Sequence, residues 1–335
     1  MLNDAARIQK ARAVDEDTAA MAAEVREGLT ASERSLPCKY FYDDRGSALF
    51  EAITRLPEYY QTRTEESLLE TIADEVIDTV RPAELVELGS GVGRKIRLLL
   101  RSMEKKQLLR SCLLFDINES FLEQSAGELS RAFDGLAVRG IAGDFTKDLS
   151  SIGGPGERAH RRMIIFLAGT IGNLHPSEVP PFLRRVRGLL EPRDAFLVGV
   201  DLVKSPSALE AAYNDSAGVT AQFNLNILAV LNRRLGANFD LASFRHVAFY
   251  DRERAWIEMR LRAVRPSRVD IPAADLSVSF HEGDEIRTEI SCKYTRASLE
   301  ALLPETGLRV GRWFTDPDNL FGLALLTRPD GERAR

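Results

Sequence analysis

The chain has 335 residues, of which 44% are hydrophobic and 28% charged, as is ordinary for a globular protein of one large domain or two smaller ones. Its 45 basic and 50 acidic residues give a net charge of −5, whereas proteins that bind nucleic acid through phosphates usually carry a basic excess. The charge therefore favours a small-molecule substrate and argues against nucleic acid.

Cysteines and histidines are few and scattered. Cys38, Cys112 and Cys292 form no CxxC pair, and the four histidines add no ligand cluster, so neither a metal site nor a disulfide framework is predicted. Residues 1–21 lack the apolar core of a signal peptide, and no segment approaches membrane-spanning length. We expect a cytoplasmic protein without membrane contact, and the sequence indicates no obligate protein partner.

Residues 16–34, rich in alanine and charge, are predicted to form a surface helix. Residues 36–66 are rich in aromatic and turn-forming residues and predict a packed loop with a short helix over 46–53. The tyrosines in this loop leave a ligand-facing surface open as a second interpretation.

From about residue 65, helices and strands alternate. The pattern predicts helices over 65–80, 94–107, 120–133 and 177–190, and strands over 84–89, 111–117, 137–145, 161–169 and 194–203. This alternation is typical of a parallel sheet with helices on both faces, in which ligands lie beyond the carboxyl ends of the strands.

After about residue 204 the alternation ends. The pattern predicts helix over 207–236 and longer antiparallel strands over 245–264, 276–280 and 285–295. A helix after 297 and two strands over 309–316 and 320–328 are expected to close the first sheet. We therefore predict an α/β domain over 64–203 and 293–330, and a second α+β domain over 16–63 and 204–292.

The sequence LVELGSGVGRK at residues 85–95 predicts a glycine turn that lets the backbone approach a ligand closely. An ATP-binding P-loop would need glycine at position 94, which is Arg94, and Ser or Thr at position 96, which is Ile96. The dinucleotide fingerprint GxGxxG also needs glycine at 94. Taken alone, the turn is as well explained by a tight structural bend.

Acidic residues at the ends of the next two predicted strands add to this signal. Asp116 is placed to accept hydrogen bonds from ribose hydroxyls, and Asp144 to bind an adenine amino group with Phe145 packed on the base. Each aspartate alone is about as often a loop cap. Together with Glu87 and Gly89 at successive strand ends, they resemble class I S-adenosylmethionine-dependent methyltransferases.

The segment FLAGTIGNLHPSEVPPF at residues 166–182 follows the fourth predicted strand. Enzymes that methylate the amino groups of bases carry an Asp/Asn-Pro-Pro-aromatic motif at this place, which is absent here. This agrees with the acidic charge in arguing against a nucleic-acid substrate.

Four segments resemble the histidine Nα-methyltransferases of ergothioneine biosynthesis: FYDDRGSALFEAITRLPEYYQTRTE, ELGSGVGRK, GTIGN and TEISCKYT. The similarity extends from about residue 35 to 328. It implies a class I methyltransferase domain with a Rossmann-like doubly wound sheet, and a second domain that binds the substrate. It also implies trimethylation of the α-amino group of L-histidine to hercynine, with S-adenosylmethionine as the cofactor.

The resemblance also implies roles for individual residues. Those expected to bind S-adenosylmethionine are Tyr59, Gly89, Lys95, Asp116, Asp144 and Phe145. Those expected to bind the head of the amino acid are Tyr42, Asn173 and Tyr213, of which Tyr42 and Asn173 act at the reacting amine. Glu289 and Ser291 are expected to recognise the imidazole.

Strand periodicity bears on the last pair independently. Residues two apart in a strand point to the same face, so Glu289 and Ser291 project together. A carboxylate acceptor and a hydroxyl suit a ring with one N–H and one bare nitrogen. The alternative is a solvated strand face that also carries Lys293.

Three other residue types have ordinary structural interpretations. Asn173 has the alternative of a helix N-cap or turn residue, and Tyr213 that of a core aromatic. His175 and His281 lie outside the motifs and are expected to be structural or surface residues.

Two further functions stay open at this point. One is Nα-methylation of another amino acid, such as a tryptophan derivative, and the other is a non-catalytic or nicotinamide-binding protein of similar fold. The Glu-x-Ser pair favours histidine, because an indole has no second ring nitrogen for a carboxylate to address.

Overall fold

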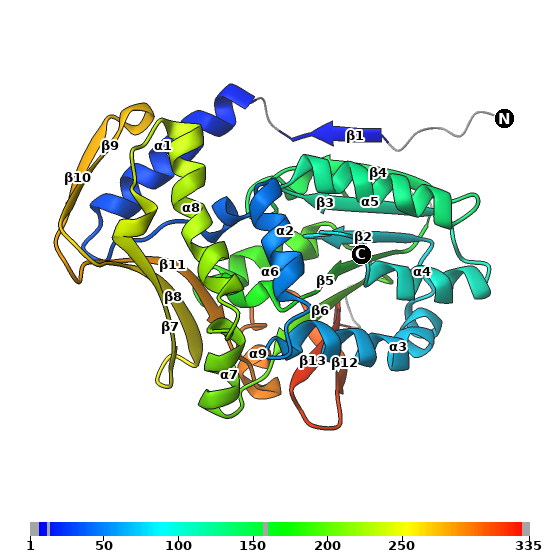
Figure 1. Ribbon diagram of the computed structural model, residues 1–335. Helices are drawn as coiled ribbons and strands as arrows, with labels where there is room; N and C mark the ends of the chain where they lie inside the picture. The colour runs from blue at the N-terminus through cyan, green and yellow to red at the C-terminus, as the bar shows by residue number, and fades with distance from the viewer. Residues whose placement is uncertain (1–6, 12–13, 157–159, 330–335) are drawn as a thin grey trace. The chain divides into compact units, whose positions relative to one another are not determined.

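The computed structural model describes residues 7–11, 14–156 and 160–329, and the chain forms two compact units (Figure 1). The first comprises Met1–Ala11, Gln61–Val203 and Lys293–Arg335, and the second Arg12–Tyr60 and Lys204–Cys292. Two predictions fall partly outside the described residues. One is the absence of a signal peptide, which concerns residues 1–6, and the other is the domain end at 330. That the first unit binds the cofactor and the second the substrate stays a prediction.

The first unit is built on an eight-stranded sheet with the order β1-β4-β3-β2-β5-β6-β13-β12. Its strands are β1 (Arg7–Lys10), β2 (Glu84–Leu88), β3 (Ser111–Asp116), β4 (Ala137–Ala142), β5 (Arg162–Phe166), β6 (Ala195–Asp201), β12 (Arg309–Thr315) and β13 (Phe321–Thr327). Strands β1 to β6 pair in parallel, and β13 runs antiparallel to both β6 and β12. The predicted closure of the sheet by the last two strands is therefore confirmed.

The sequence missed β1, which pairs with β4 at the edge of the sheet. Its four residues, RIQK, are mostly polar, and a short polar edge strand carries no hydrophobic pattern to find.

Helices cover both faces of this sheet (Figure 1). They are α3 (Tyr60–Val80), α4 (Ile96–Lys105), α5 (Glu119–Ala132), α6 (Val179–Gly188) and the short α9 (Arg296–Glu300). Apolar side chains of α3, α4 and α5 share one core cluster with Leu85, Leu114 and Leu197 of the sheet. On the other face, Phe182 of α6 contacts Phe166 and Phe196. The predicted α/β class, with a sheet covered on both sides, is confirmed.

The second unit combines helices with two small antiparallel sheets. Its elements are α1 (Val14–Thr30), η1 (Cys38–Phe41), α2 (Asp44–Ile53), α7 (Pro206–Tyr213), α8 (Val219–Leu235), β7 (Phe244–Asp251), β8 (Trp256–Ala263), β9 (Ser267–Ile271), β10 (Leu276–Phe280) and β11 (Glu285–Cys292). One sheet has the order β11-β8-β7, and β9 pairs with β10 in the other. The sequence missed β9, a short strand with buried Val269 and Ile271 between polar residues.

Two helix predictions in the second unit need correction. The helix expected over 207–236 is divided, because Asp215 accepts hydrogen bonds from the N–H groups of Val219 and Thr220 (2.8 and 2.7 Å) and starts a new helix. The prediction that α1 lies at the surface is wrong for one of its faces. Met21 and Val25, four residues apart, are fully buried in the core of the second unit.

A buried ion pair joins the two distant parts of the first unit's sequence. Lys293 Nζ lies 2.8 Å from an Asp201 carboxylate oxygen, and both side chains are almost completely buried. Asp201 ends β6, and Lys293 directly follows β11. The alternative in which Lys293 belongs to a solvated strand face is therefore wrong.

We expect Lys293→Met to lower the free energy of unfolding by about 3–5 kcal/mol, because Asp201 would keep a buried charge without its partner. Denaturant unfolding measures this loss. Arg296→Ala is the matched control: it removes an exposed pair with Glu300 and is expected to cost less than about 1 kcal/mol. Equal losses in the two variants would contradict the assignment.

His246 on β7 is half-buried and bonded through both ring nitrogens. Its Nδ1 lies 2.8 Å from Asn224 Nδ2 and its Nε2 lies 2.9 Å from the Tyr213 carbonyl oxygen. Because the Asn224 amide nitrogen can only donate, Nδ1 must accept and Nε2–H must donate, which is the neutral tautomer. Burial lowers the pKa of His246 below its ordinary value, and the hydrogen bond to Tyr213 opposes this shift in part.

A lowered pKa gives a definite pH dependence. Below the ordinary histidine pKa of about 6.5, the unfolded chain takes up a proton that folded His246 resists. The free energy of unfolding therefore decreases as the pH is lowered below this value. We expect His246→Gln to reduce this fall, measured by urea unfolding at a series of pH values. Identical slopes for His246→Gln and the wild type would refute the expectation.

Candidate functional site

The glycine turn after β2 has the conformation that the sequence predicts. Gly89, Gly91 and Gly93 have φ values of +71°, +49° and +61°, in the left-handed region that favours glycine. The N–H groups of Gly89 and Ser90 donate to the Phe115 carbonyl (2.7 and 3.2 Å), which ties the turn to β3. A β-carbon at Gly89 or Gly91 would meet nothing within 4 Å, so the space beside this backbone is open to a ligand.

Asp116 ends β3 and braces the same turn. One carboxylate oxygen accepts the Gly91 N–H at 2.8 Å, and the other accepts the Asn118 N–H at 2.9 Å. Burial raises the pKa of Asp116, while these backbone hydrogen bonds lower it. A carboxylate has about four acceptor positions, so the two hydroxyls of a ribose match its remaining capacity.

Asp144 and Phe145 follow β4. Asp144 accepts the N–H and the hydroxyl of Thr146 at 2.8 and 2.5 Å, so it does cap its own loop. The half-buried Phe145 ring contacts Phe166 edge-on, with centroids 5.0 Å apart. The adenine contact of Asp144 therefore stays a prediction. The partly exposed ring of Phe145 is suited to packing on a base.

Lys95 pairs with a residue that the sequence analysis missed. Its ammonium contacts the carboxylate of Glu65, which is completely buried on α3. The Ala168 N–H donates to both Glu65 oxygens, at 3.0 and 2.8 Å. A β-carbon at Gly199 would lie 2.2 Å from Glu65 Oε1, so any larger residue there would displace this carboxylate. The available signal was the position of Glu65 as the last residue of the YYQTRTE segment.

Glu87 on β2 is buried, and its Oε2 has no hydrogen-bond partner among the described residues. Burial raises the pKa of Glu87 well above its ordinary value; the nearby Asp116 and Glu65 raise it further, and Lys95 lowers it. Glu65 and Glu87 thus lie near one ammonium, and Asp116 adds a third carboxyl group beside Glu87. This excess of acid suits a cationic ligand with a sulfonium and an amino group, and disfavours the pyrophosphate of a nicotinamide dinucleotide.

In the second unit, Tyr213 and Ser291 form one hydrogen bond. The Tyr213 hydroxyl donates to Ser291 Oγ at 2.8 Å, and both side chains are buried. Glu289 is 9% exposed, so the alternative of a solvated strand face is wrong for this pair as well. Tyr213 is both a core aromatic and a polar neighbour of the predicted imidazole-binding residues.

Tyr42, predicted to bind the amino acid, and Tyr59, predicted to bind the cofactor, also lie in the second unit. The five predicted cofactor-binding residues besides Tyr59 lie in the first. Tyr42 is half-buried and contacts Phe50 and Phe223 edge-on, with centroids 5.8 and 5.6 Å apart. Tyr59 is buried and contacts Phe50 at 6.1 Å. The predicted roles of both tyrosines stay predictions.

Asn173 lies at the end of the 3-10 helix η3 (Thr170–Asn173) in the first unit. It is no helix N-cap, since α6 begins only at Val179 after Glu178. Its half-buried side chain makes no hydrogen bond to the described residues, so the amide is open to a ligand.

The two histidines expected to be structural or surface residues, His175 and His281, are both exposed. The side chains of the described residues include no cluster suited to a metal ion. Nor does any described helix combine the length and apolar character needed to cross a membrane.

Comparison with known proteins agrees with these features. The family model described as "Histidine-specific methyltransferase, SAM-dependent" matches residues 21–328. The chain is similar to the histidine N-alpha-methyltransferase of Mycolicibacterium smegmatis, with 45% identity over 94% of this chain and 97% of that one. It is 43% identical to the protein of the same name from Mycobacterium tuberculosis, over 96% of this chain and all of that one.

A third relative is the Neurospora crassa ergothioneine biosynthesis protein 1, with 30% identity over 88% of this chain and 33% of that longer one. The family match extends over nearly the whole described chain and includes both units. The family's cofactor, S-adenosylmethionine, is a cation, and the acidic strand ends of the first unit suit a ligand of that charge. The chain belongs to the family of S-adenosylmethionine-dependent, histidine-specific methyltransferases.

Proposed function

We propose that this protein transfers three methyl groups from S-adenosylmethionine to the α-amino group of L-histidine, giving hercynine, the first step of ergothioneine biosynthesis. The observation that carries the proposal is the near full-length identity of 43–45% to two histidine N-alpha-methyltransferases. The buried Glu289 and Ser291 support it, because a carboxylate and a hydroxyl match the two nitrogens of an imidazole.

The first unit supplies the residues proposed to bind the donor. The open turn at Gly89 admits the cofactor, and Asp116, Asp144 and Phe145 bind its nucleoside. Lys95 and the residues around it bind the amino acid end, and Tyr59 is proposed as a further cofactor-binding residue. S-adenosylmethionine supplies an already activated methyl group, so the protein contributes binding and orientation.

The residues proposed to bind histidine are those that the family resemblance implies. Glu289 accepts the imidazole N–H and Ser291 donates to the bare ring nitrogen. The Tyr213 hydroxyl turns from Ser291 and donates to the α-carboxylate. The open amide of Asn173 accepts a hydrogen bond from the amine, and Tyr42 binds the amine. Each transfer forms one N–C bond and breaks one S–C bond, and one proton leaves the nitrogen before each transfer. Positioning of this kind contributes about 7–11 kcal/mol in favourable cases.

We expect purified protein incubated with S-adenosylmethionine and a panel of amino acids to methylate L-histidine. Mass spectrometry should detect the singly, doubly and triply methylated products in succession. Methylation of a tryptophan derivative in place of histidine would reject the substrate. Absence of transfer together with bound nicotinamide dinucleotide would reject the activity.

We expect Glu289→Ala to raise the KM for histidine roughly 10- to 100-fold, because a hydrogen bond to a charged group contributes about 1.5–3 kcal/mol. Calorimetry with S-adenosylhomocysteine should show unchanged cofactor affinity. Glu282→Ala is the matched control, since Glu282 is an exposed glutamate seven residues earlier, just before β11. An unchanged KM in Glu289→Ala would remove Glu289 from the substrate site.

A further inference from the structure

Strand β11 contains a bulge at Thr288. Arg287 pairs with Arg260 of β8, but the next paired residue is Glu289, opposite Met259. Thr288 is therefore an extra residue on β11. The regular pairing resumes with Ile290 opposite Glu258 and Ser291 opposite Ile257.

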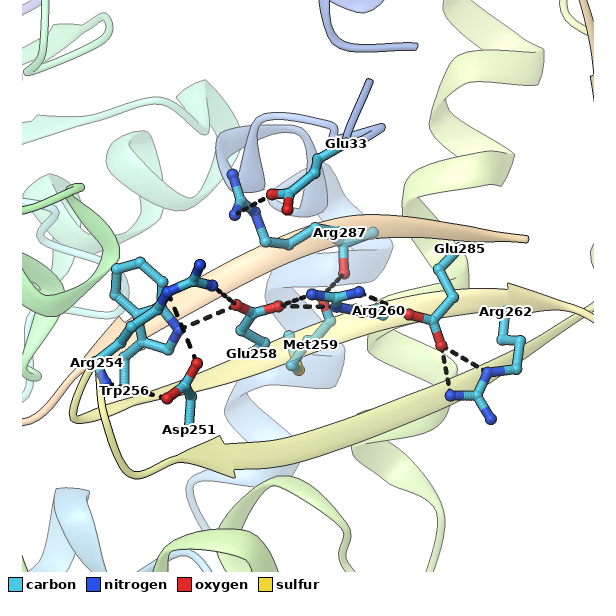
Figure 2. A network of polar contacts seen from close by, with 11 residues as sticks. Glu33, Asp251, Arg254, Trp256, Glu258, Met259, Arg260, Arg262, Glu285 and Arg287 are labelled. Carbon is cyan, nitrogen blue, oxygen red and sulfur yellow. Dashed lines mark hydrogen bonds and ion pairs between the residues drawn. The ribbon is translucent and has the colours of Figure 1, made fainter. Parts of the chain in front are cut away.

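The two faces of β8 differ sharply. Ile257, Met259 and Leu261 point into the apolar core of the second unit, which also contains Tyr213. The alternate residues carry a polar network on the opposite face, as Figure 2 shows. Its members on β8 are Trp256, Glu258, Arg260 and Arg262.

That network holds the polar face of β8 and its neighbour β11 firmly. Glu258 is fully buried and accepts from Trp256 Nε1 at 3.0 Å and from Arg260 Nε at 2.8 Å. Arg260 also donates to Glu285 of β11 at 2.7 Å, and Arg262 Nε does so at 2.6 Å (Figure 2). Glu285, before the bulge, therefore lies on the polar face.

The bulge reverses the face on which the later residues of β11 lie. In an unbroken strand, Glu289 and Ser291 would share the face of Glu285 and Arg287, because they differ from these by an even number of positions. The extra residue shifts this alternation by one. Glu289 and Ser291 instead lie opposite Met259 and Ile257, on the core side where Tyr213 reaches Ser291.

A single buried amide secures the bulge. Thr288 Oγ1 donates to Asn224 Oδ1 at 2.6 Å and also lies 3.1 Å from the Met259 carbonyl oxygen. Asn224 Nδ2 donates to the Arg260 carbonyl at 3.0 Å and to His246 Nδ1 at 2.8 Å. Both Asn224 and Thr288 are almost completely buried. Helix α8 is thus tied to β11, β8 and β7 at the level of the bulge.

The same amide leads to Tyr213. His246 receives one hydrogen of Asn224 on Nδ1 and donates its own Nε2–H to the Tyr213 carbonyl at 2.9 Å. Asn224 therefore connects the bulge, through His246, with the backbone of Tyr213. The hydroxyl of this tyrosine in turn contacts Ser291.

We propose that Thr288 and Asn224 are positioning residues for histidine recognition: their hydrogen bond fixes the bulge that turns Glu289 and Ser291 to the substrate-binding face. The inference rests on the proposed function, because it concerns the residues assigned there to the imidazole. Neither residue touches the substrate in this account, and both act through β11.

The test compares Thr288→Val with Thr288→Ser in the full-length enzyme. Valine keeps the branched shape but removes the hydroxyl, which leaves the buried Asn224 oxygen without this donor. We expect the KM for histidine to rise roughly tenfold in Thr288→Val, with the KM for S-adenosylmethionine unchanged. Thr288→Ser keeps the hydroxyl, so its KM for histidine should lie close to the wild-type value.

A matched control separates positioning from general stability. Thr306→Val removes an equally buried hydroxyl, bonded to the Leu303 carbonyl at 2.7 Å in the first unit. Its melting temperature should fall without any change in the histidine KM. If Thr288→Val kept the wild-type histidine KM, or raised both KM values equally, the inference would be overturned. Failure of the wild type to methylate histidine would instead reject the proposed function.

Discussion

Burial of both faces of the parallel strands is the constraint on which the first unit depends. Apolar side chains of α3, α4 and α5 cover one face, and α6 covers the other. Strands covered in this way can run parallel, and their carboxyl ends then meet at one edge. This is why Gly89, Asp116 and Asp144, far apart in the sequence, follow neighbouring strands.

The electrostatics at this edge depend on the same burial. In water, Glu65, Glu87 and Asp116 would each be fully ionised, and Lys95 would be one of many surface cations. Removed from water, the carboxyl groups have raised pKa values, and Glu65 is retained by an ammonium, an N–H group and the missing β-carbon of Gly199. The arrangement favours a cation on physical grounds, in agreement with the family's cofactor.

The second unit uses a different device, an interruption in a strand. The even spacing of Glu289 and Ser291 predicts that they share a face, and the pairing with β8 agrees. Which face they share is decided by one extra residue, Thr288, and by the buried amide of Asn224 that bonds it. The arginine and glutamate network occupies the opposite face of the sheet. Without the bulge, Glu289 and Ser291 would lie among these charged side chains.

The sequence alone determined the α/β class and the glycine turn with its acidic strand ends, because hydrophobic periodicity and glycine spacing act locally along the chain. It indicated the family through the resemblance of four short segments. It missed the Glu65–Lys95 pair, the edge strand β1, the break at Asp215 and the bulge at Thr288. Tertiary structure decided the ion pair, the edge strand and the bulge, since each depends on a partner distant in the sequence: a buried charge, a neighbouring strand or an amide on another helix. The break at Asp215 is local, because its carboxylate bonds residues only four and five positions later. A short-range pattern contains no information about such partners.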